Sequence, residues 1–252
     1  MSVTIAISGK GGSGKTSLIC LILRQLINKG AQPTLVVDAD PNSTLIENLE
    51  LEAPRTIGDI REQAMENKDS APAGIPKNRQ IEYELQDCLV EKGKFDLLVM
   101  GRQEGPGCYC YINNLLRQHM DRLSSSYKYI LVDNEAGMEH LSRRTTNNVE
   151  FLLIVSEPSH IGLNSAARIN VLADNLNLKI ANKYLIINKT TDPVPSVIER
   201  QISNTAIPLL GMVPLDDAII EYAVNGKSLL ELPDNSAAVK AINEMLHKLK
   251  LC

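Results

Sequence analysis

Short apolar runs alternate with longer amphipathic stretches along most of the 252-residue chain. The apolar runs are nearly continuous and rich in Val, Ile and Leu, which is typical of parallel strands buried on both faces. They predict strands at 3–8, 34–38, 95–100, 129–133, 151–155, 184–187 and 209–214. Helical spacing predicts helices at 16–29, 112–123, 161–176, 195–204 and 235–250, with a loop and a short helix at 41–49. This alternation predicts one α/β domain over 1–252, with helices on both faces of a mostly parallel sheet.

Composition and charge exclude several classes of protein. Lys and Arg total 26 against 30 Asp and Glu, so the net charge is −4, and aromatic residues are only 4% with no Trp. A nucleic-acid binder usually carries a basic surface, and a single-strand binder usually carries stacking aromatics, so we expect no nucleic-acid partner. No apolar run approaches the ~20 residues of a membrane helix, and no signal segment begins the chain. We therefore expect a cytoplasmic protein with no membrane partner.

The five cysteines do not form an obvious disulfide framework, because their number is odd and the chain is not secreted. Cys20 and Cys88 lie in apolar or mixed helical patterns and are predicted to be buried thiols. The final predicted helix places Ala238, Ile242, Met245 and Leu246 at helical spacing. Such a helix can target a membrane or pack in the core, and we expect core packing.

A glycine-rich segment lies between the first predicted strand and the first predicted helix. It matches the phosphate-loop pattern G-x-x-x-x-G-K-[ST] with Gly9, Lys10, Gly11, Gly12, Ser13, Gly14, Lys15 and Thr16. The glycines allow backbone N–H groups to surround an anion, and the helix N-terminus adds its dipole. Lys15 is expected to contact the β- and γ-phosphates, and the Thr16 hydroxyl is expected to bind Mg²⁺. The segment predicts a P-loop NTPase, with region 52–94 as an insertion on the nucleotide side.

Lys10 gives the loop a second cation, and the sequence K-G-G-S-G-K-T resembles the deviant Walker A loop of MinD-type, ParA-type and nitrogenase iron protein ATPases. The resemblance implies that Lys10 reaches the phosphates of a partner across a nucleotide-bound homodimer, as an arginine finger does. The alternative is a solvated loop lysine. Ser17 stands where many relatives carry a second Thr, and it keeps a hydroxyl near the α-phosphate.

Two acidic segments follow predicted strands, where ligands bind in open α/β sheets. Asp40, in Asp38-Ala39-Asp40-Pro41, matches switch I of the class, which orients the attacking water and approaches Mg²⁺ through water. Asp133, in D-N-E-A-G, matches switch II, which implies a water-mediated contact from Asp133 to Mg²⁺ and γ-phosphate sensing by Gly137. Taken alone, either aspartate could simply form a turn at a strand end.

Base recognition is carried by weaker patterns. Asn188, in I-N-K at a strand end, resembles the asparagine that contacts adenine, and Pro214 begins a segment that resembles the second adenine-edge loop. An Asn side chain can read a base edge or cap a loop. No Asp follows Lys189, unlike in guanine-reading GTPases, so the predicted nucleotide is ATP.

Cys108 and Cys110 form a C-x-C pair in G-P-G-C-Y-C. Two such pairs meeting at the two-fold axis of a homodimer supply four thiolates, which suit Zn²⁺, Ni²⁺ or an Fe–S cluster. On spacing alone, incidental cysteines remain an alternative.

The surrounding motifs resemble the carbon monoxide dehydrogenase accessory ATPases, known as the CooC type. The resemblance spans the chain through the phosphate loop, D-A-D-P, C-Y-C, A-G-M-E-H-L, I-N-K and the late V-P turn. It implies an ATPase that inserts nickel, binds Ni²⁺ or Zn²⁺ at an intersubunit site of four cysteine thiolates and cycles between monomer and dimer. The resemblance implies that the client is carbon monoxide dehydrogenase or acetyl-CoA synthase. The alternatives are a MinD- or ParA-type positioning ATPase and an Fe–S carrier or reductase.

Overall fold

The computed structural model describes residues 2–40, 42–52, 54–66, 83–101, 123, 125–134, 148–175, 179–191 and 193–251. Within these residues an eight-stranded sheet has the order β3-β4-β2-β5-β1-β6-β7-β8, and every neighbouring pair is parallel except β3 with β4. The strands are β1 Val3–Gly9, β2 Thr34–Ala39, β3 Leu89–Glu91, β4 Asp96–Val99, β5 Tyr129–Asn134, β6 Asn148–Ser156, β7 Lys179–Thr190 and β8 Leu209–Pro214. The predicted mostly parallel α/β sheet is confirmed.

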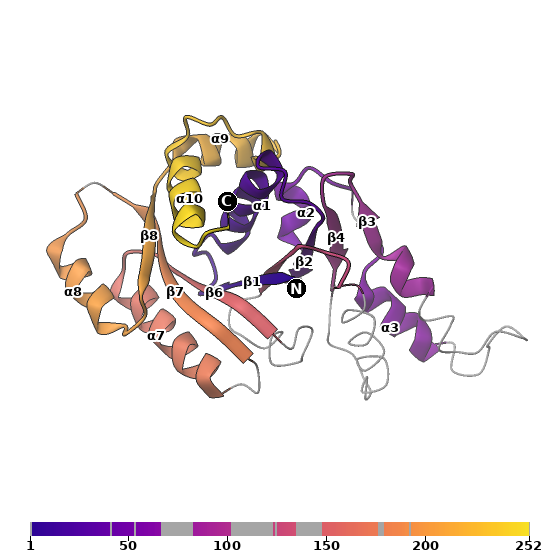
Figure 1. Ribbon diagram of the computed structural model, residues 1–252, viewed down its shortest axis with the longest axis horizontal. Helices are drawn as coiled ribbons and strands as arrows, with labels where there is room; N and C mark the ends of the chain where they lie inside the picture. The colour runs from indigo at the N-terminus through magenta and orange to yellow at the C-terminus, as the bar shows by residue number, and fades with distance from the viewer. Residues whose placement is uncertain are drawn as a thin grey trace, which may run out of the picture.

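Helices cover both faces of this sheet (Figure 1). One face packs against α1 Lys15–Asn28, α2 Thr44–Asn48, η1 Leu229–Glu231 and α10 Ala237–Lys248, with α9 Asp217–Val224 at its border. The other face packs against α3 Ile57–Glu66, α7 His160–Asn175 and α8 Ser196–Asn204. Alternation within β1 shows why both faces are apolar, because Ile5 and Ile7 enter the first cluster while Ala6 enters the second.

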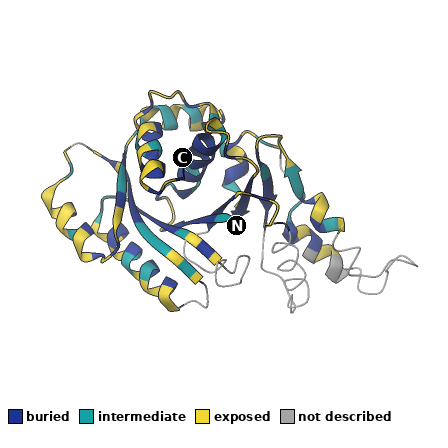
Figure 2. Cartoon of the chain, viewed as in Figure 1, coloured by how far each residue is buried: buried dark blue, intermediate teal, exposed yellow. Residues whose placement is uncertain are grey.

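Burial follows the predicted pattern closely. The central strands are buried along their length, whereas α7 and α9 keep exposed faces (Figure 2). Cys20 and Cys88 are both free thiols with no exposed surface, as expected. The last helix buries Ala238, Ile242, Met245 and Leu246 at 3% exposure or less, which confirms core packing of these positions.

Several elements differ from the expectation. Strand β7 has 12 residues, although only 184–187 were expected, because its alternating first half is half-buried and less apolar. Helix α9 was not expected, and it contains no fully buried residue; Ala218, Ile219 and Tyr222 pack only partly against the core.

Region 52–94 contributes α3 and the antiparallel edge strand β3. Its residues Ile57, Ile60 and Leu85 have no exposed surface, so part of it belongs to the sheet's second core cluster. The predicted helix at 112–123 falls largely outside the described residues.

Candidate nucleotide site

The glycine-rich loop leaves β1 at the centre of the sheet and leads directly into α1. A Cβ atom on Gly9 would lie 2.4 Å from the Val155 carbonyl oxygen, so close contact with β6 requires glycine there. Gly14 has a φ of 89° at the N-cap, and its added Cβ would lie 2.3 Å from Asn188 Nδ2. Both positions hold the loop tightly against β6 and β7.

The N-terminus of α1 has the features of an anion site. Gly14 provides no side-chain cap, and the first turn contains no acidic residue. The backbone N–H groups of that turn therefore remain available to a phosphate, and the helix dipole favours its negative charge. Lys15 is only 7% exposed, whereas Lys10 is exposed at the outer edge of the loop. The loop thus presents one buried and one outward-facing cation.

Two carboxylates lie side by side beneath this loop. Asp38 on β2 and Asp133 on β5 are paired in register, and they are 0% and 1% exposed. Burial, followed by the charge of Asp133, raises the pKa of Asp38 to about 7. Burial also raises the pKa of Asp133 to about 6, against the opposing effects of the Thr16 hydroxyl and the Lys15 ammonium. Two carboxyl groups that repel each other when ionised are therefore buried side by side.

These carboxylates fit a divalent cation. Among the described residues, Asp38 Oδ2 and both Asp133 carboxylate oxygens have no hydrogen bond of standard geometry. Mg²⁺ prefers hard oxygen ligands, often with waters between the ion and the carboxylate, and its charge would relieve the repulsion. Thr16 is close enough to influence Asp133, and its Oγ1 lies 3.3 Å from Thr44 Oγ1 on α2. The buried donor set therefore fits the magnesium ion of a bound nucleotide.

Asp38 belongs to the D-A-D-P segment, but the sequence pattern predicted no role for it. The available signal was an aspartate within a buried strand, because Leu35, Val36, Val37 and Ala39 around it are all apolar. A carboxylate at such a position requires a partner or a shifted pKa.

Asp40 lies at the mouth of the site and is half-buried. Its Oδ1 accepts hydrogen bonds from the backbone N (2.9 Å) and side-chain Nδ2 (3.0 Å) of Asn42, while its own backbone N donates to Asp38 Oδ1 (3.1 Å). These contacts form a turn at the end of β2. The role of Asp40 in orienting water stays a prediction.

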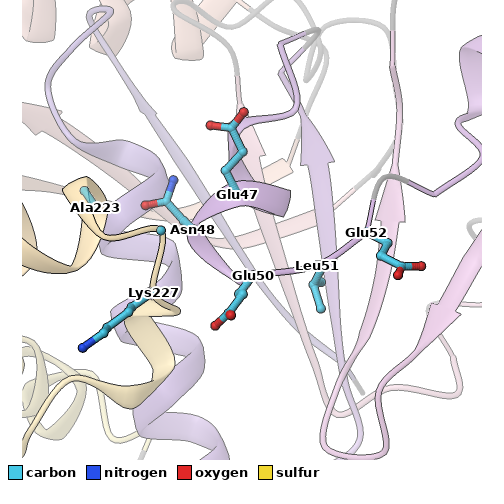
Figure 3. Close-up of a pocket in the computed structure, with 8 residues that line it drawn as sticks. Glu47, Asn48, Glu50, Leu51, Glu52, Ala223 and Lys227 are labelled. Carbon is cyan, nitrogen blue, oxygen red and sulfur yellow. The ribbon is translucent and has the colours of Figure 1, made fainter.

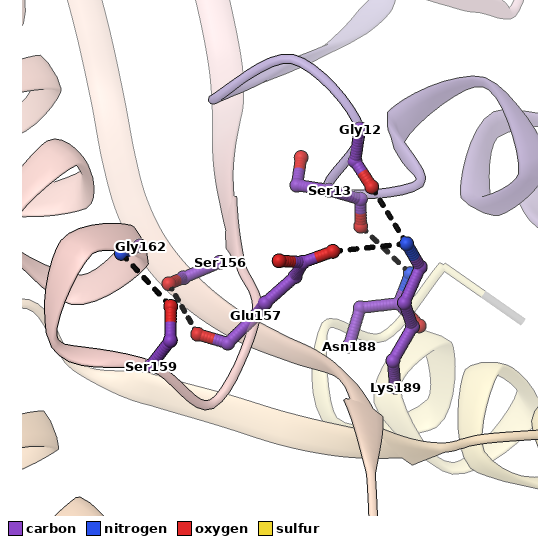
Figure 4. A network of polar contacts seen from close by, with 8 residues as sticks. All are labelled: Gly12, Ser13, Ser156, Glu157, Ser159, Gly162, Asn188 and Lys189. Atoms are coloured by element: carbon purple, nitrogen blue, oxygen red, sulfur yellow. Dashed lines mark hydrogen bonds and ion pairs between the residues drawn. The ribbon is translucent and has the colours of Figure 1, made fainter.

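The end of β7 contacts the loop from the other side (Figure 4). Asn188, 7% exposed, donates from Nδ2 to the Ser13 carbonyl oxygen at 2.8 Å. Lys189 Nζ donates to the Gly12 carbonyl oxygen at 2.7 Å and pairs with Glu157 Oε1 at 2.9 Å. Asn188 therefore contacts the loop backbone, as in the loop-capping alternative, while its contact with adenine stays a prediction. The contacts of Lys189 were not foreseen.

The segment after β8 is fixed by Asp216. Its Oδ1 accepts from the Ala218 backbone N at 3.0 Å and caps α9, while its Oδ2 accepts from Ser236 Oγ at 2.6 Å and Ala238 N at 3.0 Å. The Pro214 segment is thereby tied to the start of α10. Its predicted role at the adenine edge is not tested by these contacts.

A separate groove of about 560 Å³ lies between the end of α2 and the turn after α9 (Figure 3). It contains no residue of the glycine-rich loop. Its lining residues are Glu47, Asn48, Glu50, Leu51, Glu52, Ala223, Gly226 and Lys227. Three carboxylates against one ammonium make it unsuited to phosphate, so the nucleotide site is placed by the loop and not by this groove.

Three predicted site residues, Gly137, Cys108 and Cys110, lie outside the described residues. In the part of the chain that is described, no group of three or more His, Cys, Asp or Glu side chains is arranged to hold a metal ion. Nor does any described helix combine the length and hydrophobicity needed to cross a bilayer.

The sheet order, the loop between β1 and α1 and the carboxylates at adjacent strand ends define a P-loop nucleotide-binding protein. Residues 4–230 match the CobQ/CobB/MinD/ParA nucleotide binding domain, and the chain belongs to this family.

Three individual proteins show how far the similarity extends. The chain is 41% identical over 247 residues, 97% of each protein, to an uncharacterised ATP-binding protein of Methanocaldococcus jannaschii. It is 32% identical over 242 residues to the carbon monoxide dehydrogenase accessory protein CooC of Rhodospirillum rubrum, covering 90% of this chain and 89% of CooC. The cell division ATPase MinD of Pyrococcus furiosus superposes over 100% of both chains with a TM-score of 0.71 at 21% identity, which shows the shared fold. The protein is therefore an ATP-binding member of the group that contains MinD, ParA and CooC.

Proposed function

We propose that the protein is an ATP-hydrolysing metallochaperone that delivers nickel to carbon monoxide dehydrogenase or to the related acetyl-CoA synthase. The observation that carries the proposal is the 32% identity to CooC over nine-tenths of the chain. The C-x-C pair of Cys108 and Cys110 supports it chemically, because thiolates bind Ni²⁺ and Zn²⁺ well.

The nucleotide half of this function uses the described site. The α1 N-terminus and Lys15 bind the phosphates, while Thr16, Asp38 and Asp133 would hold Mg²⁺ directly or through water. When bound, Mg²⁺ neutralises charge on the β- and γ-phosphates. Asp40 orients the attacking water at the mouth of the site.

Lys10 acts across a dimer in this proposal. Its side chain is exposed at the loop's outer edge, so a second protomer's nucleotide could approach it. A cation delivered in trans stabilises charge that develops during phosphoryl transfer, and hydrolysis becomes coupled to dimerisation.

The metal half places the cargo ion between two protomers, each contributing Cys108 and Cys110. Because four thiolates are shared, metal binding and dimerisation strengthen each other. We expect one Ni²⁺ or Zn²⁺ per two chains. ATP hydrolysis then changes the dimer and the sulfur geometry, which gives a route for handing the ion to the client.

Metal titration of the reduced, anaerobically purified protein tests this proposal. The Cys108→Ser/Cys110→Ser double variant should lose metal-induced dimers in sedimentation while still binding ADP. Cys252→Ser, which also removes a thiol, serves as the matched control and should dimerise as wild type does. Equal stoichiometry and dimerisation in the double variant would exclude the pair as the metal site.

Further measurements on the same purified protein separate the alternative functions. Iron with acid-labile sulfide in the purified protein would favour an Fe–S carrier. A MinD- or ParA-type protein would instead bind lipid vesicles or DNA in an ATP-dependent way without thiol-bound metal. The packed apolar face of α10 leaves that helix no free stripe for a membrane surface, which speaks against MinD-type membrane binding through α10.

A further inference from the structure

The side chains at the end of β7 contact the outside of the phosphate loop through two consecutive carbonyl groups. Asn188 holds the Ser13 carbonyl, and Lys189 holds the Gly12 carbonyl (Figure 4). In a trans peptide the C=O and the following N–H point in opposite directions. Fixing these two carbonyls outward therefore also fixes the planes that carry the Ser13 and Gly14 amides.

This arrangement departs from regular strand geometry. Successive side chains of a strand point to opposite faces, yet Asn188 and Lys189 both reach the same loop. The pairing of β7 with β8 shifts register between Asn188 and Thr190, so Lys189 lies in an irregularity of the strand. Lys189 also has a φ of 59°, in the left-handed region that is unfavourable for a lysine. Bulges and such backbone strain commonly re-aim side chains beside functional sites.

Glu157, just after β6, completes the contact. Its carboxylate pairs with Lys189 Nζ at 2.9 Å, and the two side chains are 39% and 43% exposed. The turn that carries Glu157 is itself anchored, because the Glu157 backbone carbonyl accepts hydrogen bonds from Ser156 Oγ at 2.8 Å and from the Ser159 backbone N at 2.7 Å. One ammonium thus joins the loop to the ends of both β6 and β7.

We propose that Lys189, held by Glu157, is a positioning residue that pins the Gly12 carbonyl and so presets the phosphate loop for nucleotide. The proposal deepens the nucleotide half of the proposed function and rests on the loop binding ADP or ATP. Lys189 acts through the loop backbone, and Glu157 acts through Lys189. A flexible loop would have to be ordered when nucleotide binds, so a pinned loop binds more tightly.

Calorimetric titration of Mg·ADP into single variants measures this effect. Lys189→Met should weaken ADP binding about fivefold, the size expected when one part-exposed charged hydrogen bond is lost. Lys189→Arg should restore most of the affinity, because a donor of similar reach returns. Lys183→Met is the matched control, since Lys183 also lies on β7 but makes its ion pair away from the loop. The distance from its Nζ to Asp174 Oδ1 is 2.6 Å. It should bind ADP as wild type does.

Two further variants distinguish positioning from other roles. As a single substitution, Glu157→Gln should weaken ADP binding by a smaller factor than Lys189→Met does. In the double variant it should cause no further loss of ADP affinity, because both residues act through one contact. Lys189→Gly removes the ammonium but relieves the left-handed backbone, so it should weaken ADP binding while keeping the thermal midpoint of the nucleotide-free protein. If Lys189 had a purely structural role, its replacement would lower the thermal midpoint and the ADP affinity together.

Wild-type affinity in Lys189→Met and Lys189→Gly would overturn the proposal. Tighter binding in Glu157→Gln would also overturn it, because that result means Lys189 contacts nucleotide directly once released. Absence of ADP binding by the wild-type protein would overturn both this inference and the nucleotide half of the function. ADP binding without nickel delivery would overturn the metallochaperone alone and leave the positioning role standing.

Discussion

Replacing Asp38 by Asn removes one negative charge from the buried carboxylate pair while preserving the shape of the side chain. The introduced carboxamide would keep an oxygen to accept from the Asp40 backbone N and gain an N–H group to donate to Asp133. In the nucleotide-free, Mg²⁺-free protein we therefore expect Asp38→Asn to stabilise the fold at alkaline pH, although the change damages the site.

The pKa of Asp38 gives the magnitude and the sign. It rises from an ordinary 3.8 to about 7, so the folded protein keeps a proton that the unfolded chain has released. The carboxylate therefore destabilises the fold progressively as the pH rises from 4 to 7, with the full penalty above 7. A shift of about 3 units corresponds to at most ~4 kcal/mol, of which we expect about 2 kcal/mol to be recovered.

Urea unfolding in EDTA between pH 5 and 8.5 checks this expectation. The gain in free energy of unfolding for Asp38→Asn should be largest at pH 8 and should shrink as the pH falls toward 4. Asp174→Asn, at a side chain that is 66% exposed, is the control and should show no such pH dependence. The Asp38→Asn variant should also lose most of the Mg²⁺-dependent gain in nucleotide affinity. A pH-independent change, or destabilisation at pH 8, would refute the picture of an Asp38 carboxylate that is destabilised by burial and by the charge of Asp133 beneath the loop.

Further substitutions test the other parts of the site. Lys15→Ala should abolish ATP binding, whereas Lys10→Ala should still bind ATP but lose hydrolysis and nucleotide-driven dimers. Equal losses of ATP affinity in the two variants, measured by calorimetry, would contradict this division of roles. Asp40→Ala should bind ATP and trap the dimer, because ground-state phosphate contacts survive while water orientation is lost; hydrolysis at the wild-type rate would remove Asp40 from the mechanism. Burial raises the pKa of Asp216, but hydrogen bonds from Ser236, Ala238 and Ala218 lower it overall. Asp216→Asn should therefore cost about 1 kcal/mol at pH 7 and less below about pH 4, the opposite trend to Asp38→Asn, as urea unfolding at the two pH values would show.

Much of the fold followed from local pattern. Continuous apolar runs identified the parallel strands, and the loop between 9 and 16 lay where its motif requires. Strand β3 was missed because three residues at a sheet edge carry too short a pattern. Helix α9 was missed because its apolar residues are divided between a partly buried side, with Ala218, Ile219 and Tyr222, and an exposed side, with Ile220 at 49% and Val224 at 81%.

The candidate site was only partly readable in advance. Its glycines and lysines form one contiguous motif, so the sequence pattern could place them between the first strand and the first helix, where the structure has them. The role of Asp38 depends on its register with Asp133, which lies 95 positions later in the chain. The contact of Lys189 with Gly12 spans 177 positions and depends on an irregularity in β7. Such relationships arise from pairing between distant strands and leave no periodic signal in the sequence.

Nickel transfer to a client tests the central claim most directly. Nickel-loaded protein is mixed with nickel-free carbon monoxide dehydrogenase, or in parallel with acetyl-CoA synthase, and nickel bound to the reisolated client is counted. The account predicts rapid transfer to one client with ATP, and little transfer with a non-hydrolysable analogue or with the Asp40→Ala protein. Transfer that is equally fast without ATP, or no transfer to either client, would contradict an ATP-driven metallochaperone.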